Sequence, residues 1–548
     1  MKAVLLLLLA AAMLAASERD ALAISGNIRE RHLPFGTILD PVYASAGSDW
    51  ITEYSRCGDS AIWTGHYLAA EAFRYSVTRS AEALDNVRAA LAGLRSLADV
   101  TGTGLLARCL VPVSSPYAAG ITQSEAQHGI HLAGLNGVRH YWIGNTSRDQ
   151  YCGVFFGLAV AFDMVDDASV RSDAAALATR LLDFLVRNSW SVRMPDGSIS
   201  TTFLGRPDQR LALLQIGRRL NPDRFSGTYG LSRFFEAGSV GNPIAVEVLD
   251  PHNSYFKFNL DTINLYNLIR LETSSFKTFY DQAYDLMRRT LDDHGNAHFN
   301  VIDRALRGPR AARDQETRAY LRDWLLRPRR DPYVDWRGRI PACGDDRACS
   351  PIPVVDRVTT DFLWQRSPFL LYGGGEGTIE GAGIDYILPY WMGRYYGVIP
   401  AGPQPPAALP ASPSGGLGAQ ALFQLRIWDP DGYADITLGL VVINGELSAS
   451  QSCYLYYDRG RSSIWLMNDA GNAWFGPAKL GAPVLLQNSR CRIDAGGSSD
   501  LGVGETLTLN LDAGFPAAGG LKSVYMYAQD AAGLSTGGWQ QVGSWTAP

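Results

Sequence analysis

The stretch GDSAIWTGHYLAAEAFRYSVT, residues 58–78, decides the fold of the larger part of the chain. Its apolar and small side chains recur every three to four residues, which predicts a helix with one continuous apolar face. Gly65, Ala69 and Ala72 would let a second helix approach closely. We therefore expect this segment to be an inner, enclosed helix of a helical domain. Its apolar face is formed by Ile62, His66, Ala69, Phe73 and Val77.

The next segment, 80–99, is amphipathic, with Leu and Val on one stripe and Asp and Arg opposite. Alternating enclosed and one-sided helices are what two concentric helix layers require. We therefore expect residues 24–399 to form an all-α toroid of helical hairpins. The alternative is an irregular bundle or solenoid, because 190–257 and 296–380 fit the repeat poorly. The contrast recurs at 148–165 with 169–188, at 259–272 with 274–294, and in a last candidate helix from Gly383.

The sequence changes character after residue 399. Residues 400–420 are rich in Pro, Ala and Gly and are typical of an extended linker. Residues 421–548 alternate apolar and polar side chains between turn residues, which predicts a small all-β sandwich of about seven strands. The turn at 429–432 and the ending GWQQVGSWTAP make this part resemble the immunoglobulin-like modules of secreted bacterial proteins.

The N-terminus has the features of a secretory signal peptide. Lys2 is followed by an apolar run and by Ala21-Leu22-Ala23, so we expect a leader of residues 1–23. The alternative is an uncleaved membrane anchor. Because no other apolar run is long enough to span a bilayer, we expect no membrane span in the mature chain. The predicted location is secreted, periplasmic or on the cell surface.

Seven cysteines in an exported chain suggest disulfides. Cys343 and Cys349 enclose a short loop, and Cys453 and Cys491 are the two cysteines of the C-terminal part. These spacings predict two bridges. Three cysteines remain, so at least one thiol stays free, and the sequence leaves their pairing open. They are Cys57, Cys109 and Cys152.

Composition excludes several function classes. The net charge of -5 gives no basic field for nucleic acid. The chain has no GxSxG, Walker loop, HExxH or zinc-spaced Cys/His pattern, so we expect neither a cofactor nor a metal. Asp429-Pro-Asp431-Gly suggests calcium, but a Pro-Asp-Gly turn is a simpler explanation. We expect a monomer that binds a polysaccharide or oligosaccharide.

Two carboxylates stand at the starts of predicted inner helices. Asp59 opens the helix at 59–78, and Asp149 opens the helix at 148–165. Parallel inner helices place their N-terminal ends at one mouth, so these side chains should face each other there. The alternative is helix capping alone, since Asp is favoured at that position.

Residues near these carboxylates are those that carbohydrate chemistry needs. Aromatic rings stack on sugars, Arg and Asn bind hydroxyls, and carboxylates act as acid and base. A third acidic stretch, with Glu376 and Glu380, precedes the last inner helix and should reach the same mouth. The predicted substrate-binding residues are Arg56, Trp63, Trp142, Asn145, Arg148, Tyr151, Trp364 and Glu376.

With these residues in view, residues 45–400 resemble the six-hairpin glycan-active superfamily. The resemblance rests on GDSAIWTGHYLAAEAFRYSVT, on TSRDQYCGVFFGLAVAFDMVDD and on the Gly-rich stretch before the last helix. It implies a secreted glycoside hydrolase, for which we expect Asp149 as the general acid and Asp59 or Glu380 as the base. One alternative is a polysaccharide lyase of the same fold, to which His252 and Tyr255 would contribute. The other is a non-catalytic carbohydrate-binding protein.

Overall fold

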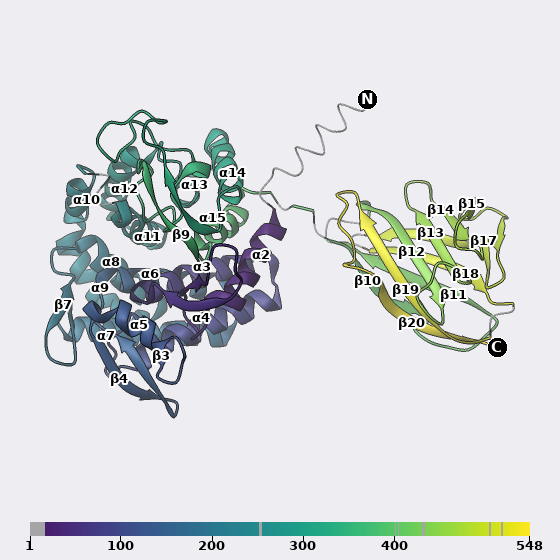
Figure 1. The fold of residues 1–548 in the computed structure, drawn as a ribbon, viewed down its shortest axis with the longest axis horizontal. Coiled ribbons are helices and arrows are strands. Elements are labelled where there is room, and N and C mark those ends of the chain that lie inside the picture. The colour runs from purple at the N-terminus through teal and green to yellow at the C-terminus, as the bar shows by residue number, and fades with distance from the viewer. Residues whose placement is uncertain are drawn as a thin grey trace. The chain divides into compact units, whose positions relative to one another are not determined.

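The computed structural model describes residues 17–548 except 251, 253–254, 401, 404, 430–432, 504–505 and 517–518. The chain divides into two compact units, Met1–Pro400 and Ala401–Pro548. The first unit is mainly helical and the second is made of strands (Figure 1). Within the described part of the chain, no helix is both long and apolar enough to cross a membrane.

The core of the first unit is formed by a series of enclosed helices that pack on one another in chain order. Each contacts the next, and the last contacts the first, so the series closes on itself. Most of their side chains are buried on every side. The members are α3 (Ser60–Thr78), α6 (Arg148–Met164), α8 (Pro207–Leu220), α11 (Tyr255–Leu271), α13 (Ala297–Arg307) and α15 (Ile384–Tyr395).

A second set of helices packs outside the first, and five of its members follow their inner partner in the chain. In α4, buried Val87, Leu91 and Leu94 alternate with exposed residues, so only one face is covered. The pairing of enclosed and one-sided helices predicted from the sequence is confirmed where it was proposed. The outer helices are α4 (Ala81–Asp99), α7 (Ala168–Arg187), α9 (Pro222–Glu236), α12 (Lys277–Leu291), α14 (Ala311–Leu325) and α2 (Glu18–Asn27), which packs on α15.

Helices α3 and α6 approach closely because glycines face each other. A Cβ atom on Gly65 would lie 2.1 Å from the carbonyl oxygen of Gly153, and one on Gly157 would lie 2.3 Å from the carbonyl oxygen of Gly65. Neither position has room for a side chain. The glycines therefore set the spacing of the two helices and, with it, the spacing of their N-terminal ends.

Short sheets and helices connect these hairpins. One sheet has the order β2-β1-β9-β8, a second has the order β3-β5-β4, and β6 pairs with β7. The strands are β1 (Asp40–Tyr43), β2 (Ile51–Ser55), β3 (Cys109–Pro112), β4 (Ile130–Leu135), β5 (Val138–Ile143), β6 (Ser191–Arg193), β7 (Ile199–Thr202), β8 (Arg330–Asp335) and β9 (Tyr372–Glu380). The short helices are α5 (Ala118–Ser124) and α10 (Gly241–Glu247).

Helix α2 spans the expected end of the leader. Residues 1–16 lie outside the described part, but α2 runs through the predicted cleavage point at Ala23. Ala21 and Ile24 are buried, and Glu18 forms an ion pair with Arg394 of α15. The expected boundary at Ala23 therefore falls within a packed helix.

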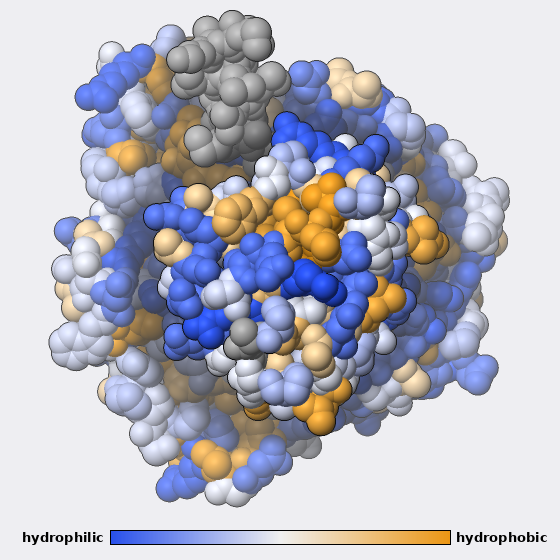
Figure 2. All heavy atoms as spheres, turned by 90° about the vertical axis from the view of Figure 1, so that its right-hand side faces the viewer, coloured by the Kyte–Doolittle hydropathy of each residue, from blue (hydrophilic) through white to orange (hydrophobic). Residues whose placement is uncertain are grey.

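The second unit consists of two antiparallel sheets that share one hydrophobic core. Their orders are β10-β11-β18-β17-β16 and β15-β14-β13-β12-β19-β20, which exceeds the predicted seven strands. In Figure 2, hydrophobic side chains form small patches between hydrophilic ones. The strands are β10 (Ala407–Ser412), β11 (Gln420–Trp428), β12 (Ile436–Asn444), β13 (Cys453–Asp458), β14 (Ser463–Met467), β15 (Trp474–Lys479), β16 (Leu485–Gln487), β17 (Arg492–Val503), β18 (Thr506–Gly514), β19 (Gly520–Asp530) and β20 (Gln540–Ala547).

The predicted linker at 400–420 is corrected in part. Residues Ala407–Ser412 form strand β10, which pairs antiparallel with β11. An edge strand needs hydrogen bonds on one side only, so it tolerates the proline at 410. The segment that looked like a spacer therefore belongs to the second unit.

Three disulfides are present. Cys343–Cys349 and Cys453–Cys491 confirm the two predicted bridges. The pairing that the sequence left open is Cys57–Cys109, which ties the start of α3 to β3. Cys152 is free and buried.

Candidate functional site

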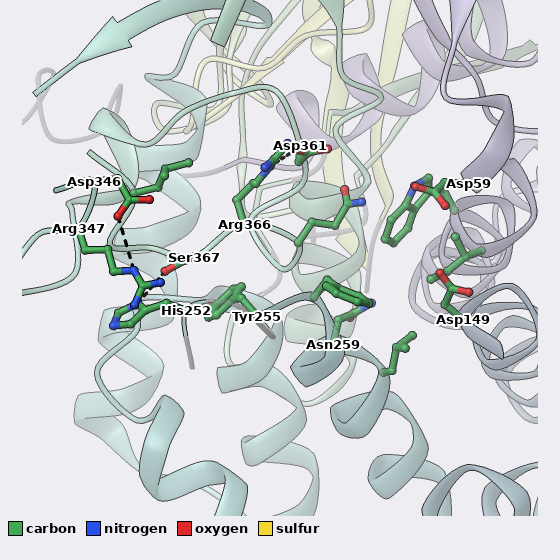
Figure 3. A pocket seen from close by; sticks show the side chains of 16 residues that line it. Asp59, Asp149, His252, Tyr255, Asn259, Asp346, Arg347, Asp361, Arg366 and Ser367 are labelled. Carbon is green, nitrogen blue, oxygen red and sulfur yellow. Dashed lines mark hydrogen bonds and ion pairs between the residues drawn. The ribbon is translucent and has the colours of Figure 1, made fainter. Parts of the chain in front are cut away.

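A cavity of about 490 Å³ lies at the N-terminal ends of three inner helices (Figure 3). The first turns of α3, α6 and α11 form one side, and the loop between β8 and β9 forms the other. The cavity is lined by Asp59, Ile62, Trp63, Asp149, His252, Tyr255, Phe256, Asn259, Leu260, Asp346, Arg347, Asp361, Gln365, Arg366, Ser367 and Leu370.

Asp59 and Asp149 lie in the same wall of this cavity, as Figure 3 shows. Asp59 immediately precedes α3, and Asp149 lies in the first turn of α6. Neither helix start is capped by a side-chain hydrogen bond, so Asp59 does not act as a cap there. The capping alternative therefore does not account for Asp59.

Gln150 fixes Asp59 relative to α6. Its Nε2 donates to Asp59 Oδ1 at 3.1 Å, and its Oε1 accepts from the backbone N–H of Ile62 at 3.0 Å. Gln150 is fully buried, so this bridge is shielded from water. The N-terminal ends of α3 and α6 are thus joined by one side chain.

Arg108 connects the two segments that lead into these helices. Its guanidinium donates to the carbonyl of Gly58 at 2.7 Å and to Ser147 Oγ at 2.8 Å. The same group lies 3.9 Å from Asp59 Oδ1. Arg108 therefore holds the helix starts in place and is a distant counter-charge for Asp59.

The Asp59 carboxyl group keeps its proton to a higher pH than an ordinary aspartic acid does. Burial and the nearby Asp149 carboxylate raise the pKa of Asp59 to about 6, although Arg108 and Gln150 act in the opposite direction. The side chain is still 39% exposed, so a ligand in the cavity can reach it. Asp149 has its Oδ1 buried without a hydrogen-bond partner. Asp59 therefore keeps its proton up to about pH 6, and one carboxylate oxygen of the neighbouring Asp149 has no hydrogen-bond partner.

The other charged groups of the cavity are paired. Asp361 contacts Arg366 and also Arg56, at 3.2 Å from the latter. Asp346 lies 3.7 Å from Arg347. Asp361 and Asp346 therefore have arginine partners within the lining, whereas the arginine nearest to Asp59, Arg108, lies outside it.

A cluster of aromatic and imidazole rings packs beside Trp63. The ring of Trp63 meets those of Phe362 and His66 edge to face, at centroid distances of 4.9 and 5.2 Å. Burial lowers the pKa of His66 to about 4, and that of His298 falls further. Both imidazoles are therefore neutral, and this cluster forms an uncharged wall behind the carboxylates.

Glu380 does not join the two aspartates. It does not line the cavity, and it accepts hydrogen bonds from Asn27 Nδ2 at 2.6 Å and from the Tyr43 hydroxyl at 3.1 Å. His32 and Arg329 each lie 3.7 Å away. The expectation that Glu380 reaches the same mouth is wrong, because strand β9 directs it into this separate ion cluster.

Four predicted binding residues around Asp149 also lie away from the cavity lining. Trp142 is buried and stacks on His131 at 4.1 Å. Arg148 donates to the carbonyl of Thr202, and Tyr151 is enclosed, with its hydroxyl accepting from the N–H of Leu106. Asn145 is exposed, and its amide donates to the carbonyl of Gln127. These residues are near Asp149 in the chain, but their side chains point away from the cavity and contact other parts of the unit.

The remaining predicted residues divide between core and surface. Trp63 lines the cavity, whereas Trp364 is fully buried behind it. Arg56 is held by Asp40 at 3.1 Å and by Asp361, and it lines a smaller neighbouring cavity. Glu376 is exposed on β9, outside the main cavity. The structure therefore brings together Asp59, Asp149 and Trp63 from the predicted set.

The sequence did not predict that Asp346, Arg347 and Ser367 reach the cavity from the loop between β8 and β9. His252, which the sequence offered for a lyase, lines the same cavity. His252 Nδ1 lies 3.2 Å from Ser367 Oγ, although the two are far apart in the chain. The Cys343–Cys349 loop that carries Asp346 and Arg347 was a detectable signal, because a stapled loop holds its side chains in place.

Comparisons of the sequence with protein families and with curated proteins find no match. Solved structures similar to this chain include the cellobiose 2-epimerase from Spirochaeta thermophila DSM 6192, with a TM-score of 0.32 and 10% identity, covering 68% of this chain and 96% of that chain. Another is the endoglucanase CelQ from Clostridium thermocellum, with a TM-score of 0.31 and 10% identity, covering 83% and 80%. These TM-scores are too low to support a functional assignment.

Proposed function

We propose that the first unit is a glycoside hydrolase that binds a polysaccharide or oligosaccharide in the cavity at the start of α3 and α6. The observation that carries the proposal is the pair of carboxylates, Asp59 and Asp149, at adjacent helix starts in one cavity. Hydrolysis of a glycosidic bond uses two carboxyl groups, one protonated and one ionised. The raised pKa of Asp59 supports this division of roles.

The roles differ from those expected from the sequence. Asp59 would donate its proton to the leaving oxygen, because burial and Asp149 keep that proton bound up to about pH 6. Asp149 would act as the base or nucleophile, since it lines the same cavity and Asp59 is the carboxyl group that holds the proton. Trp63 would contact a sugar face, and Arg347 and Arg366 would contact hydroxyl or carboxylate groups across the cavity.

The setting that we propose is an exported monomer. The closed series of inner helices supports an α/α toroid of the six-hairpin kind, and the two sheets with a shared core support an immunoglobulin-like sandwich. The three disulfides fit an oxidising compartment outside the cytoplasm.

A lyase is the second candidate, and one observation favours it. His252 and Arg347 lie in the same cavity, and burial and Arg347 lower the pKa of His252, which keeps the imidazole neutral and able to accept a proton. Tyr255 is a weaker candidate base, because burial raises its pKa. β-Elimination would also need a uronate substrate, which the two arginines could bind.

The test is digestion of a panel of neutral and uronate-containing glycans by the full chain, with new reducing ends and ultraviolet absorbance measured in parallel. Asp59→Asn and Asp149→Asn are compared with Glu376→Gln, which alters an exposed acid outside the cavity. New reducing ends without absorbance, lost in both Asp variants alone, support the hydrolase. Absorbance supports the lyase. Sugar binding without either signal supports a non-catalytic protein.

A further inference from the structure

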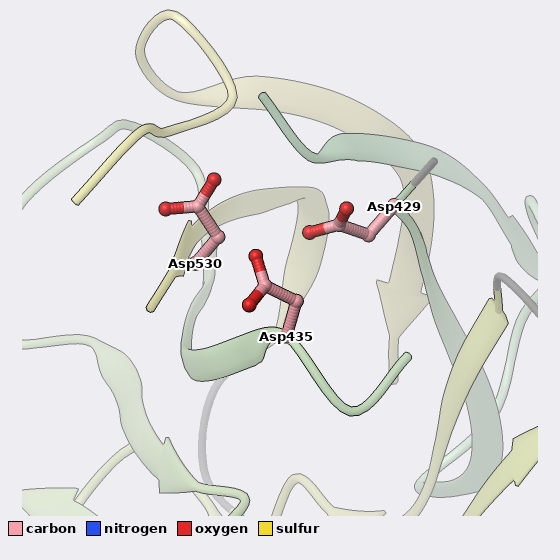
Figure 4. Close-up of side chains that lie close together, drawn as sticks. All are labelled: Asp429, Asp435 and Asp530. Carbon is pink, nitrogen blue, oxygen red and sulfur yellow. The ribbon is translucent and has the colours of Figure 1, made fainter. Parts of the chain in front are cut away.

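Three carboxylates meet in the second unit, outside the site described above. One oxygen from each of Asp429, Asp435 and Asp530 can be chosen so that all three lie within 4.8 Å of one another, and Figure 4 shows the three side chains close together. Asp429 follows β11, Asp435 precedes β12, and Asp530 ends β19. The first belongs to one sheet and the other two to the other sheet, where Ile436 pairs with Asp530.

The burial of these groups distinguishes them from an ordinary acidic surface cluster. Asp429 is 0% exposed and Asp530 is 2% exposed. Ionised carboxylates this close repel one another, and their removal from water is costly unless a positive charge compensates. Among the described residues, no lysine or arginine forms an ion pair with Asp435 or Asp530.

Asp530 supplies an independent sign of a ligand. Its Oδ1 accepts from the N–H of Leu534 at 2.7 Å, which explains its position in the turn after β19. Its Oδ2 is buried and has no hydrogen-bond partner. A turn-capping role uses one oxygen, so the second oxygen needs a different partner.

We propose that Asp429, Asp435 and Asp530 bind a calcium ion that clamps the β11–β12 connection to the end of β19. Calcium prefers oxygen ligands and is commonly held by several carboxylates, whereas magnesium usually keeps water and takes one or two. Asp429, the first residue of the stretch that the sequence alone explained as a turn, then has a ligand function as well. The ion would tie the two sheets together at one end.

The test is calorimetric titration of the EDTA-treated full chain with calcium chloride, and separately with magnesium chloride. We expect one calcium per chain, much weaker magnesium binding, and loss of calcium binding in Asp530→Asn. Asp512→Asn is the matched control, because this partly exposed aspartate lies at the far end of β18 from the cluster. Calcium at a hundred times its Kd should favour the folded second unit about a hundredfold, seen as a higher unfolding midpoint.

Asp435→Asn guards against a variant that fails to fold. In EDTA the unfolding midpoint of this variant should be no lower than that of the wild type, because one of the mutually repelling charges is gone. In calcium the wild type's midpoint should rise, whereas that of the variant should not. Absence of calcium binding in the wild type would overturn the proposal. Equal binding by Asp435→Asn or Asp530→Asn, or equal affinity for magnesium, would overturn it as well.

Discussion

Asp59 and Glu380 are two carboxylic acids of the same unit that end in opposite surroundings. Asp59 lies beside another carboxylate, with its nearest arginine 3.9 Å away, and its pKa rises to about 6. Glu380 is also buried, but His32, Arg329 and Asn27 outweigh that burial and lower its pKa to about 2. Burial alone therefore does not decide protonation, because the partners of each group do.

This difference separates a reactive site from a structural one. A carboxyl group that keeps its proton near neutral pH can act as an acid, whereas one fixed as an anion by cationic neighbours holds structure together. Both residues precede predicted inner helices, so their positions in the sequence look alike. Their backbone contexts differ, since Asp59 immediately precedes helix α3 whereas Glu380 is the last residue of strand β9.

The largest expected effect is on catalysis. Asp59→Asn and Asp149→Asn should each lower activity by about 10²- to 10⁴-fold on the substrate that the glycan panel identifies, because each removes an acid–base group. Glu380→Gln should keep its activity when rates are compared per folded molecule. Equal losses in all three variants would remove the distinction between the two regions.

The next effect concerns the spacing that brings Asp59 to Asp149. Gly65→Ala should lower the free energy of unfolding by about 3 kcal/mol, because the new methyl group meets the backbone of α6. Gly227→Ala in α9 is the control: nothing lies within 4 Å of the added carbon, and alanine should stabilise this exposed helix by about 1 kcal/mol. Urea unfolding measures both, and a neutral Gly65→Ala would contradict the close packing.

Glu380 should affect stability in a pH-dependent way. Its pKa is lowered in the folded chain, so its ionised form stabilises the protein above its ordinary pKa of 4.5, and this contribution is lost as the pH falls towards 2. Glu380→Gln should cost about 2 kcal/mol at pH 7 and progressively less in acid. Urea unfolding over this pH range tests it, and a constant difference would contradict the role of the ion cluster.

The sequence predicted part of the helical fold well. Helices α3, α6, α11 and α15 were found because their apolar residues surround the helix. Helices α8 and α13 were missed because they are short, at 14 and 11 residues, and each carries two or more arginines that interrupt the apolar pattern. Periodicity of apolar residues cannot reveal an inner helix of that kind.

For the site, the sequence located Asp59 and Asp149 but not their surroundings. Residues adjacent in the chain to Asp149, such as Trp142 and Tyr151, face other parts of the unit. Arg347 and Arg366 reach the cavity from a long loop whose path depends on a disulfide and on packing. Proximity in the chain therefore predicted the site residues poorly, whereas a position at the start of an inner helix predicted them well.

The most direct test of the central claim is a titration of the Asp59 carboxyl by NMR, in the full chain and in Asp149→Asn. The account predicts a pKa of about 6 in the wild type and a lower value in the variant, because the repulsion from the Asp149 carboxylate is removed. An ordinary pKa near 3.8 in the wild type, or no change in the variant, would contradict the claim that the two aspartates act as a coupled pair.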